Sequence, residues 1–162
     1  MRQPRGKGKR VAGHREQILF RDRYVCACRQ HHSHLGDTLS LANYVALPHL
    51  LVSVQEDRVG RVDALLAEHQ LKRHTALSVP HFLVAPSVLA ETDLIATLAR
   101  RIAQAFAQTH GLKLLPLPLE LEGFAVRMRW HQSRQGSPAD QWLRDQILTV
   151  SRQVDDAVAD ET

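Results

Sequence analysis

Hydrophobic residues follow two different periods along this chain, and their alternation predicts strands and helices in turn. A short, continuously apolar run at residues 49–54 has the pattern of a buried parallel strand. Residues 61–69 then place apolar side chains at the i, i+3, i+4 and i+7 spacing of a core-facing helix. A second strand is expected at residues 74–79. Strand, helix and strand form a βαβ unit, which indicates a parallel sheet.

The other expected elements extend this α/β pattern on both sides of the βαβ unit. A third strand at residues 94–98 follows a helical passage that Pro86 interrupts, and Gly111 marks the end of the next helix. Ser40 and Ser137 stand where helix N-caps are expected. Further strands are predicted at residues 18–28, 112–119 and 124–131, and further helices at residues 40–47, 99–110 and 138–152.

Two of the predicted helices have an apolar stripe that indicates which face is buried. In the helix at residues 99–110, Ile102, Ala105 and Phe106 share one face. The last helix has its stripe at Trp142, Leu143, Ile147, Val150 and Val154. Both stripes are therefore expected to face a core.

The charge of the chain is concentrated at its beginning. The net charge is +4, and residues 1–10 contain five basic side chains and no acidic one. Such charge blocks are usually solvated, so residues 1–17 are interpreted as a basic disordered tail. The alternative is a nucleic-acid tether, although phosphate contacts alone carry no base information. Residues 153–162 are expected to form an acidic tail.

Cysteine and histidine usage favours a reducing compartment and gives no metal site. Cys26 and Cys28 alternate with an alanine in a predicted strand, and a Cys-x-Cys pair alone cannot ligate zinc. Buried thiols in the cytoplasm are the better interpretation. The histidines of loop 29–37 lack the helical spacing that converges imidazoles on a metal, so the loop is interpreted as a solvated turn.

No membrane or export segment is expected, and no enzyme motif is found. Apolar runs fall short of the roughly 20 residues that a membrane span needs, and the N-terminus lacks the apolar core of a signal peptide. There is no Gly-x-Ser-x-Gly elbow, Walker loop, His-Glu-x-x-His pair or dinucleotide-binding glycine motif after a strand. We predict no catalytic residue, metal ligand or cofactor.

Polar and aromatic residues at the carboxyl ends of the expected strands are the candidate ligand site. Ligands of open α/β sheets bind outside these strand ends. Ser53 is near the end of the first strand and could donate to an anion. His81 follows the second strand and could pair with a carboxylate, with Phe82 as an apolar wall. Thr97 is expected to end the third strand. Each of these residues alone more often has a capping or packing role, and only their shared location at the strand ends brings the case for a ligand site level with that interpretation.

The wording VPHFLVAPSVLAETDLIATLARR, at residues 79–101, resembles the effector-binding domain of LysR-type transcriptional regulators. The stretch LFRDRYVC at residues 19–26 looks like the hinge strand of that family, and Trp130-His131 follows in the family's order. The sequence has Leu98-Ala99 where many relatives have a proline after the strand. The resemblance covers residues 18–152.

This resemblance implies a periplasmic-binding-protein type 2 fold, in which two Rossmann-like lobes clamp an effector. Residues 29–120 would then be a complete lobe two. Residues 18–28 and 121–152 would be hinge strands and a remnant of lobe one. Ser53, His81, Phe82 and Thr97 fall on effector-facing positions of lobe two. The implied partners are a small aromatic or organic acid and further copies of the chain, in a dimer or tetramer.

The resemblance also implies parts that the sequence does not contain. The winged helix-turn-helix and the first elements of lobe one have no counterpart, so the chain is expected to be an excised or truncated piece that does not read DNA by itself. Open strand edges of a partial lobe would favour self-association. The alternative function is a stand-alone solute-binding or dimerisation protein that acts without DNA contact.

Overall fold

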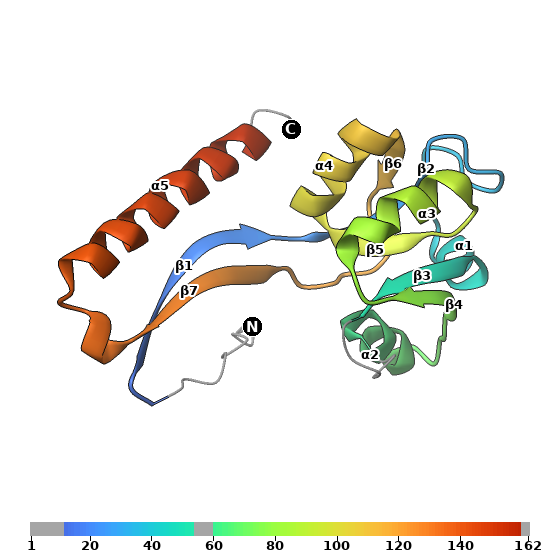
Figure 1. The fold of residues 1–162 in the computed structure, drawn as a ribbon. Helices are drawn as coiled ribbons and strands as arrows, with labels where there is room; N and C mark the ends of the chain where they lie inside the picture. The colour runs from blue at the N-terminus through green and yellow to red at the C-terminus, as the bar shows by residue number, and fades with distance from the viewer. Residues whose placement is uncertain (1–11, 54–59, 160–162) are drawn as a thin grey trace. The chain divides into compact units, whose positions relative to one another are not determined.

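The computed structural model describes residues 12–53 and 60–159, with side chains as far as residue 152 (Figure 1). The chain divides into two compact units, and each is described by itself. The larger unit spans residues 22–123 and the smaller unit comprises residues 1–21 and 124–162. Most of the expected tail at residues 1–17 lies outside the described residues.

The larger unit alternates strands and helices, as the sequence predicts. Its elements are β2 (Tyr24–Arg29), α1 (Leu41–Ala46), β3 (Pro48–Val52), α2 (Arg61–Glu68), β4 (His74–Val79), the 3₁₀ turn η1 (Phe82–Val84), α3 (Ala85–Glu91), β5 (Ala96–Ala99), α4 (Arg100–His110) and β6 (Leu112–Leu115). The predicted caps are confirmed: Ser40 Oγ accepts from the Asn43 N–H, and Gly111 ends α4 with a φ of 62°.

Strand β3 precedes α2 in the chain and β4 follows it. The two strands pair with each other in parallel, so the predicted βαβ unit is confirmed. A parallel bridge between His49 and Ile95 connects β3 to the segment that leads into β5. Strand β5 then pairs antiparallel with β2, and β2 pairs antiparallel with the edge strand β6. The third strand therefore begins later than expected. Its main ladder of backbone hydrogen bonds is the antiparallel one with β2. Only the bridge between His49 and Ile95 relates this strand to β3 in parallel.

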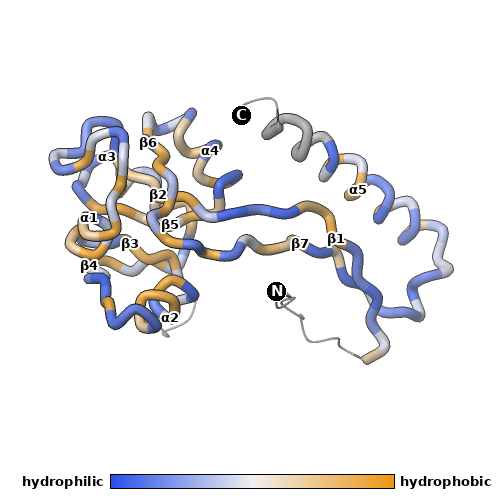
Figure 2. The backbone as a smooth tube through the Cα atoms, turned by 180° about the vertical axis from the view of Figure 1, so that it is seen from behind, coloured by the Kyte–Doolittle hydropathy of each residue, from blue (hydrophilic) through white to orange (hydrophobic). Residues whose placement is uncertain are grey.

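Side chains of this sheet alternate between two hydrophobic clusters on opposite faces. Cys26, Cys28 and Ile95 pack with α1 and α2 in one cluster, and Ala27 and Ala96 pack with α3 and α4 in the other. Figure 2 shows the hydrophobic segments gathered on the strands of the larger unit. Both thiols are buried as predicted, and burial raises their pKa values above the usual range.

Helix α4 buries a different face from the one predicted. Ala103 is fully buried, and Phe106 and Ala107 pack against the same cluster. Ile102 and Ala105 are exposed, so the predicted stripe is wrong at these two positions and confirmed at Phe106. The fully buried position on α4 is thus occupied by the small side chain of Ala103.

The predicted strand at residues 18–28 is divided at Arg23. Strand β1 (His14–Asp22) pairs with β7 (Phe124–His131), whereas β2 pairs with β5 and β6. The Asp22 carboxylate accepts from the N–H groups of Arg23 and Arg101 at 2.8 and 3.4 Å. The hydrogen bonds from the backbone N–H groups of Arg23 and Arg101 to the Asp22 side chain thus fix the point where the chain changes its strand partner.

The smaller unit contains β1, β7, the 3₁₀ turn η2 (Gln132–Arg134) and α5 (Pro138–Ala159). Residues 14–17, expected in the tail, belong to β1, and α5 continues beyond the expected end at residue 152 into the predicted acidic tail. The predicted N-cap is confirmed, since Ser137 Oγ accepts from the Asp140 N–H at 3.4 Å.

The predicted apolar stripe of α5 is not buried within its unit. Trp142 is 64% exposed, and Leu143 and Val150 are also exposed. Ile147 is half-buried, and the side chain of Val154 lies outside the described residues. The buried side of α5 instead carries Arg144, which donates to the backbone carbonyls of Arg134 and Gln135 and lies 5.0 Å from the Trp130 ring centre. The helix is therefore attached to the turn after β7 by a polar side chain.

Gly123 lies so close to the backbone of Asp22, where the chain changes its strand partner, that there is no room for a side chain at this position. A Cβ atom at Gly123 would lie 2.5 Å from the Asp22 carbonyl oxygen, and a backbone atom cannot rotate away. We expect Gly123→Ala to lower the free energy of unfolding by about 1–3 kcal/mol, as overpacking does. Urea denaturation measures this. Gly36→Ala is the matched control, because a Cβ there meets nothing within 4 Å; equal stability of the two variants would contradict the prediction.

Candidate functional site

The carboxyl ends of β3 and β4 meet at one edge of the sheet, as parallel pairing requires. The Ser53 N–H donates to the Val79 carbonyl at 3.0 Å, so the ladder continues to the last residue of β4. Ser53 follows β3 directly, and His81 and Phe82 follow β4 after Pro80. The structure therefore places Ser53, His81 and Phe82 at the ends of neighbouring strands.

The turn after β4 exposes an apolar surface beside a histidine. His81 is exposed and precedes η1, which begins at Phe82. Phe82 is 43% exposed, and Leu83 is 81% exposed. Pro86 and Ala85 at the start of α3 are buried, so the turn is anchored on its C-terminal side. An anchored apolar turn with one imidazole suits a ligand that has an apolar body and an anionic group.

Thr97 lies in a different environment from the other three candidates. It stands within β5, which ends at Ala99, so the expectation that it ends the strand is wrong. Thr97 is opposite Cys26 and is half-buried, and its Oγ1 lies 2.7 Å from the hydroxyl oxygen of Tyr44. The sheet carries Thr97 on the other side of β3 from β4, on the face that α1 and α2 cover.

A buried polar network connects Thr97 to the charged core of the larger unit. The Arg73 guanidinium, in a residue only 6% exposed, forms a two-pronged ion pair with Asp63, with N–O distances of 2.7 and 2.8 Å. Its Nη1 lies 3.5 Å from Nδ1 of His49. His49 Nε2 donates to the Tyr44 carbonyl at 2.7 Å, and the Tyr44 hydroxyl contacts Thr97. The network therefore joins α2, β3, α1 and β5.

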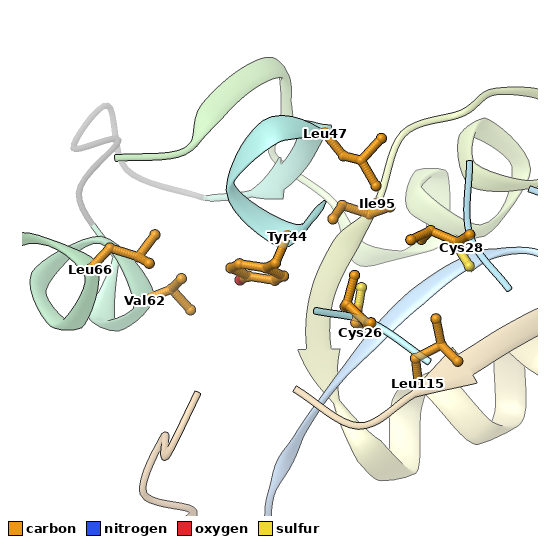
Figure 3. Close-up of a cluster of buried hydrophobic side chains, with 10 residues drawn as sticks. Cys26, Cys28, Tyr44, Leu47, Val62, Leu66, Ile95 and Leu115 are labelled. Carbon is orange, nitrogen blue, oxygen red and sulfur yellow. The ribbon is translucent and has the colours of Figure 1, made fainter. Parts of the chain in front are cut away.

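Tyr44 is the centre of the hydrophobic cluster as well as a member of this network. Figure 3 shows its ring between Val62 and Leu66 of α2 on one side and Ile95 and Cys26 of the sheet on the other. The ring also meets the His49 imidazole edge-on, with centroids 4.7 Å apart. Tyr44 is fully buried, so the position of its hydroxyl beside Thr97 is fixed by packing on both sides.

The charges of the network set its protonation states. Burial raises the pKa of Asp63, but hydrogen bonds from Arg73 and the Gly60 N–H outweigh it and hold the pKa below its usual range. Burial lowers the pKa of His49 from 6.5 to about 4; the bond to the Tyr44 carbonyl opposes this shift, and the Arg73 charge adds to it. At neutral pH the network is thus an aspartate–arginine pair with a neutral histidine.

Sequence reasoning missed most of this network. Asp63 and Arg73 are ten residues apart and belong to different elements, so no local pattern pairs them. His49 stands at the start of its strand, away from the carboxyl ends where a ligand site is expected, yet it is completely buried. A histidine inside a continuous apolar run was the available signal.

The histidine loop between β2 and α1 is more ordered than a solvated turn. The Asp93 carboxylate accepts from Arg29 Nε at 2.7 Å and from the Ser33 N–H and hydroxyl at 3.2 and 2.9 Å. His32 is buried, with Nε2 3.0 Å from the Asp93 carbonyl, so the interpretation of the whole loop as solvated is wrong. In residues 12–53 and 60–152, no three His, Cys, Asp or Glu side chains are grouped so that they could hold a metal ion.

The described helices give no sign of a membrane segment: none of them combines the length and the apolar character that spanning would need.

The neutral state of His49 predicts a loss of stability in mild acid. In the unfolded chain His49 takes up a proton near pH 6.5, whereas the folded chain does not until about pH 4. The unfolded state therefore binds more protons between these values, and the free energy of unfolding falls as the pH falls, by up to about 3 kcal/mol. Urea denaturation at pH 7.5, 6, 5 and 4 measures this slope. We expect His49→Gln to flatten it, and His31→Gln, at an exposed position, to leave it unchanged; an unaltered slope in His49→Gln would contradict the assignment.

Comparison with known proteins supplies the family. The profile described as LysR substrate binding domain matches residues 5–152. The HTH-type transcriptional activator NagR from Ralstonia sp is 36% identical over 135 residues, which cover 83% of this chain and 45% of NagR. The chain thus spans less than half the length of this relative.

Solved structures agree with the fold. The regulatory domain of MexT, a transcriptional activator in Pseudomonas aeruginosa, is 33% identical, with a TM-score of 0.74 over 85% of this chain and 68% of that one. The effector-binding domain of QuiR, solved in complex with shikimate, matches with a TM-score of 0.68 at 14% identity, over 91% and 69% of the two chains, and shows the fold alone. The α/β fold is therefore that of LysR regulatory domains, which have a periplasmic-binding-protein type 2 architecture, and the chain belongs to the LysR substrate-binding domain family.

Proposed function

We propose that this chain is the effector-sensing part of a LysR-type transcriptional regulator and that its effector is a small aromatic or other organic acid. The observation that carries the proposal is the family match over residues 5–152, together with the exposed strand-end turn that combines His81 with Phe82. Residues 29–120 would serve as lobe two. Residues 18–28 and 121–152 would serve as hinge strands and part of lobe one.

The proposed effector site is Ser53, His81, Phe82 and Thr97. His81 supplies a positive charge when protonated and a hydrogen bond when neutral, so it suits a carboxylate. Phe82 supplies an exposed aromatic face for the body of the ligand. Ser53 and Thr97 supply hydroxyl groups. The Thr97 hydroxyl already contacts Tyr44, but it has one donor and two acceptor sites, so this bond leaves it capacity for a ligand.

The proposed mechanism is a shift between conformations of the domain. A ligand changes such an equilibrium only if it binds one state more tightly than the other. Thr97 is connected to the core through the Tyr44–Arg73 network, so an acid bound beside it would favour one arrangement of these elements. In the whole protein, this conformational change would be transmitted to a helix-turn-helix domain. The protein would act as a dimer or tetramer in the cytoplasm.

The relatives named above are transcriptional regulators. This does not favour the alternative of a stand-alone solute-binding or dimerisation protein that acts without DNA.

The strand-end site predicts which side chains control the response to ligand. We expect at least one acid from a panel of aromatic and aliphatic carboxylates to raise the thermal midpoint of the chain, because it binds only the folded state. At a ligand concentration of 100 times Kd the expected stabilisation is about 2.7 kcal/mol. His81→Ala and Phe82→Ala should each reduce that shift. Leu77→Ala, which truncates an exposed apolar side chain on β4, is the matched control. An undiminished shift in both site variants would count against this site.

A further inference from the structure

A pocket in the larger unit lies where β2, β6 and α4 come together. It encloses about 440 Å³, which is within the range of small-molecule sites. Its walls come from the start of β2, the beginning of α4, and the segment that includes the end of β6 and continues from it. None of the four strand-end residues lines it, so it is a different site from the one proposed above.

Two arginines lie side by side in the lining of this pocket. Strands β2 and β5 are antiparallel with Tyr24 opposite Ala99, and the next pair in this register is Arg23 with Arg100. The Arg100 N–H donates to the Arg23 carbonyl at 2.8 Å, so the backbones remain paired at this position. Directly opposite residues of an antiparallel pair project to the same side. Both guanidiniums therefore belong to the same wall, and both residues line the pocket.

This arrangement brings two positive charges together without a counter-charge from the described chain. Like charges directly opposite each other destabilise a sheet. Neither guanidinium forms an ion pair or hydrogen bond with a residue of 12–53 or 60–152. The nearby Asp22 carboxylate is bound to backbone N–H groups. Glu120 and Glu122, on the lining segment, are exposed and pair with neither arginine.

Much of the remaining lining of the pocket is apolar. Leucine side chains predominate, from Leu114, Leu115, Leu117, Leu119 and Leu121, with Pro116 and Val25. The Leu121 N–H donates to the Leu119 carbonyl at 2.9 Å, which forms a tight turn in this wall. A pocket whose lining combines two cations with several leucines matches an anion that has an apolar body. The leucines do not suit free phosphate, which has no apolar surface to bury.

We propose that this pocket binds a small amphipathic carboxylate, with the carboxylate between Arg23 and Arg100 and the apolar body against the leucines. A guanidinium can hold a carboxylate through two parallel hydrogen bonds. A bound anion would also neutralise the repulsion between the two arginines. The proposal rests on the register and the pocket, and it does not depend on the strand-end site or on the proposed function.

Calorimetric titration of the intact chain with benzoate tests the charge requirement, with benzamide as the neutral probe of the same shape. We expect Arg23→Gln and Arg100→Gln each to weaken benzoate binding at this pocket about tenfold or more, because each removes a charge-assisted hydrogen bond. Arg23→Lys, which keeps the charge, should weaken it less and gives a second test if a glutamine variant folds poorly. Arg61→Gln, at an exposed position on α2, is the matched control and should bind as the unsubstituted chain does.

Leucine-methyl NMR assigns the binding to one of the two sites. Benzoate is expected to shift the methyl signals of Leu114, Leu117, Leu119 and Leu121. These shifts should persist in His81→Ala and disappear in Arg23→Gln and Arg100→Gln. The proposal would be overturned if benzoate did not shift the signals of the pocket methyl groups, or if it shifted them in both arginine variants as much as in the unsubstituted chain. Equal responses to benzoate and benzamide would overturn it as well.

Discussion

The buried ion pair between Asp63 and Arg73 is the interaction on which the geometry of the larger unit depends. Two charges cannot be taken out of water unless each is well paired, and the two-pronged contact between them meets that requirement. Arg73 stands just before β4, and Asp63 belongs to the first turn of α2. The pair therefore fixes where β4 begins relative to α2. The contacts of His49 with Arg73 and with the Tyr44 carbonyl extend this network to β3 and α1, and the Tyr44 hydroxyl extends it to Thr97. These polar contacts lie at the starts of β3 and β4, and Ser53, His81 and Phe82 follow the opposite ends of the same strands.

A second constraint is the change of strand partner at Asp22 and Arg23. The side chain of Asp22 takes two backbone N–H groups, and Gly123 lies against its carbonyl group. The same crossing brings Arg23 beside Arg100. One short segment thus ends β1, begins β2 and places two guanidiniums on one pocket wall. Sheet topology, and not a sequence motif, creates that pair of charges.

Local signals in the sequence predicted the fold well where each element is defined by its own residues. The βαβ unit at 49–79, the Ser40 and Ser137 caps and the Gly111 stop all follow from short-range patterns, and the structure confirms them. The candidates Ser53, His81 and Phe82 were found because strand ends can be located from these patterns. The break at Arg23 could not be predicted, since an alternating pattern continues through it and the cause lies in contacts to Arg101 and Gly123.

The remaining differences also have long-range causes. Periodicity identified the apolar stripe of α5, but periodicity cannot show whether a partner covers it, and Trp142 is exposed within its unit. The true inner face of α4 carries Ala103, a small residue that a search for large apolar residues overlooks. The pairing of Arg73 with Asp63, and of Tyr44 with Thr97, joins residues far apart in the sequence. Such pairs require the three-dimensional structure.

Native-state hydrogen exchange of the intact chain tests most directly whether the network holds the larger unit together. The amides of Leu50 and Ile95 bond across the bridge between β3 and β5, and the amide of Ser53 bonds to β4. If the network makes these strands one cooperative unit, the three amides should share one opening free energy, and Asp63→Asn should lower all three together. Opening of the β3–β4 pair at a lower free energy than β2 and β5 in the unsubstituted chain would contradict this account.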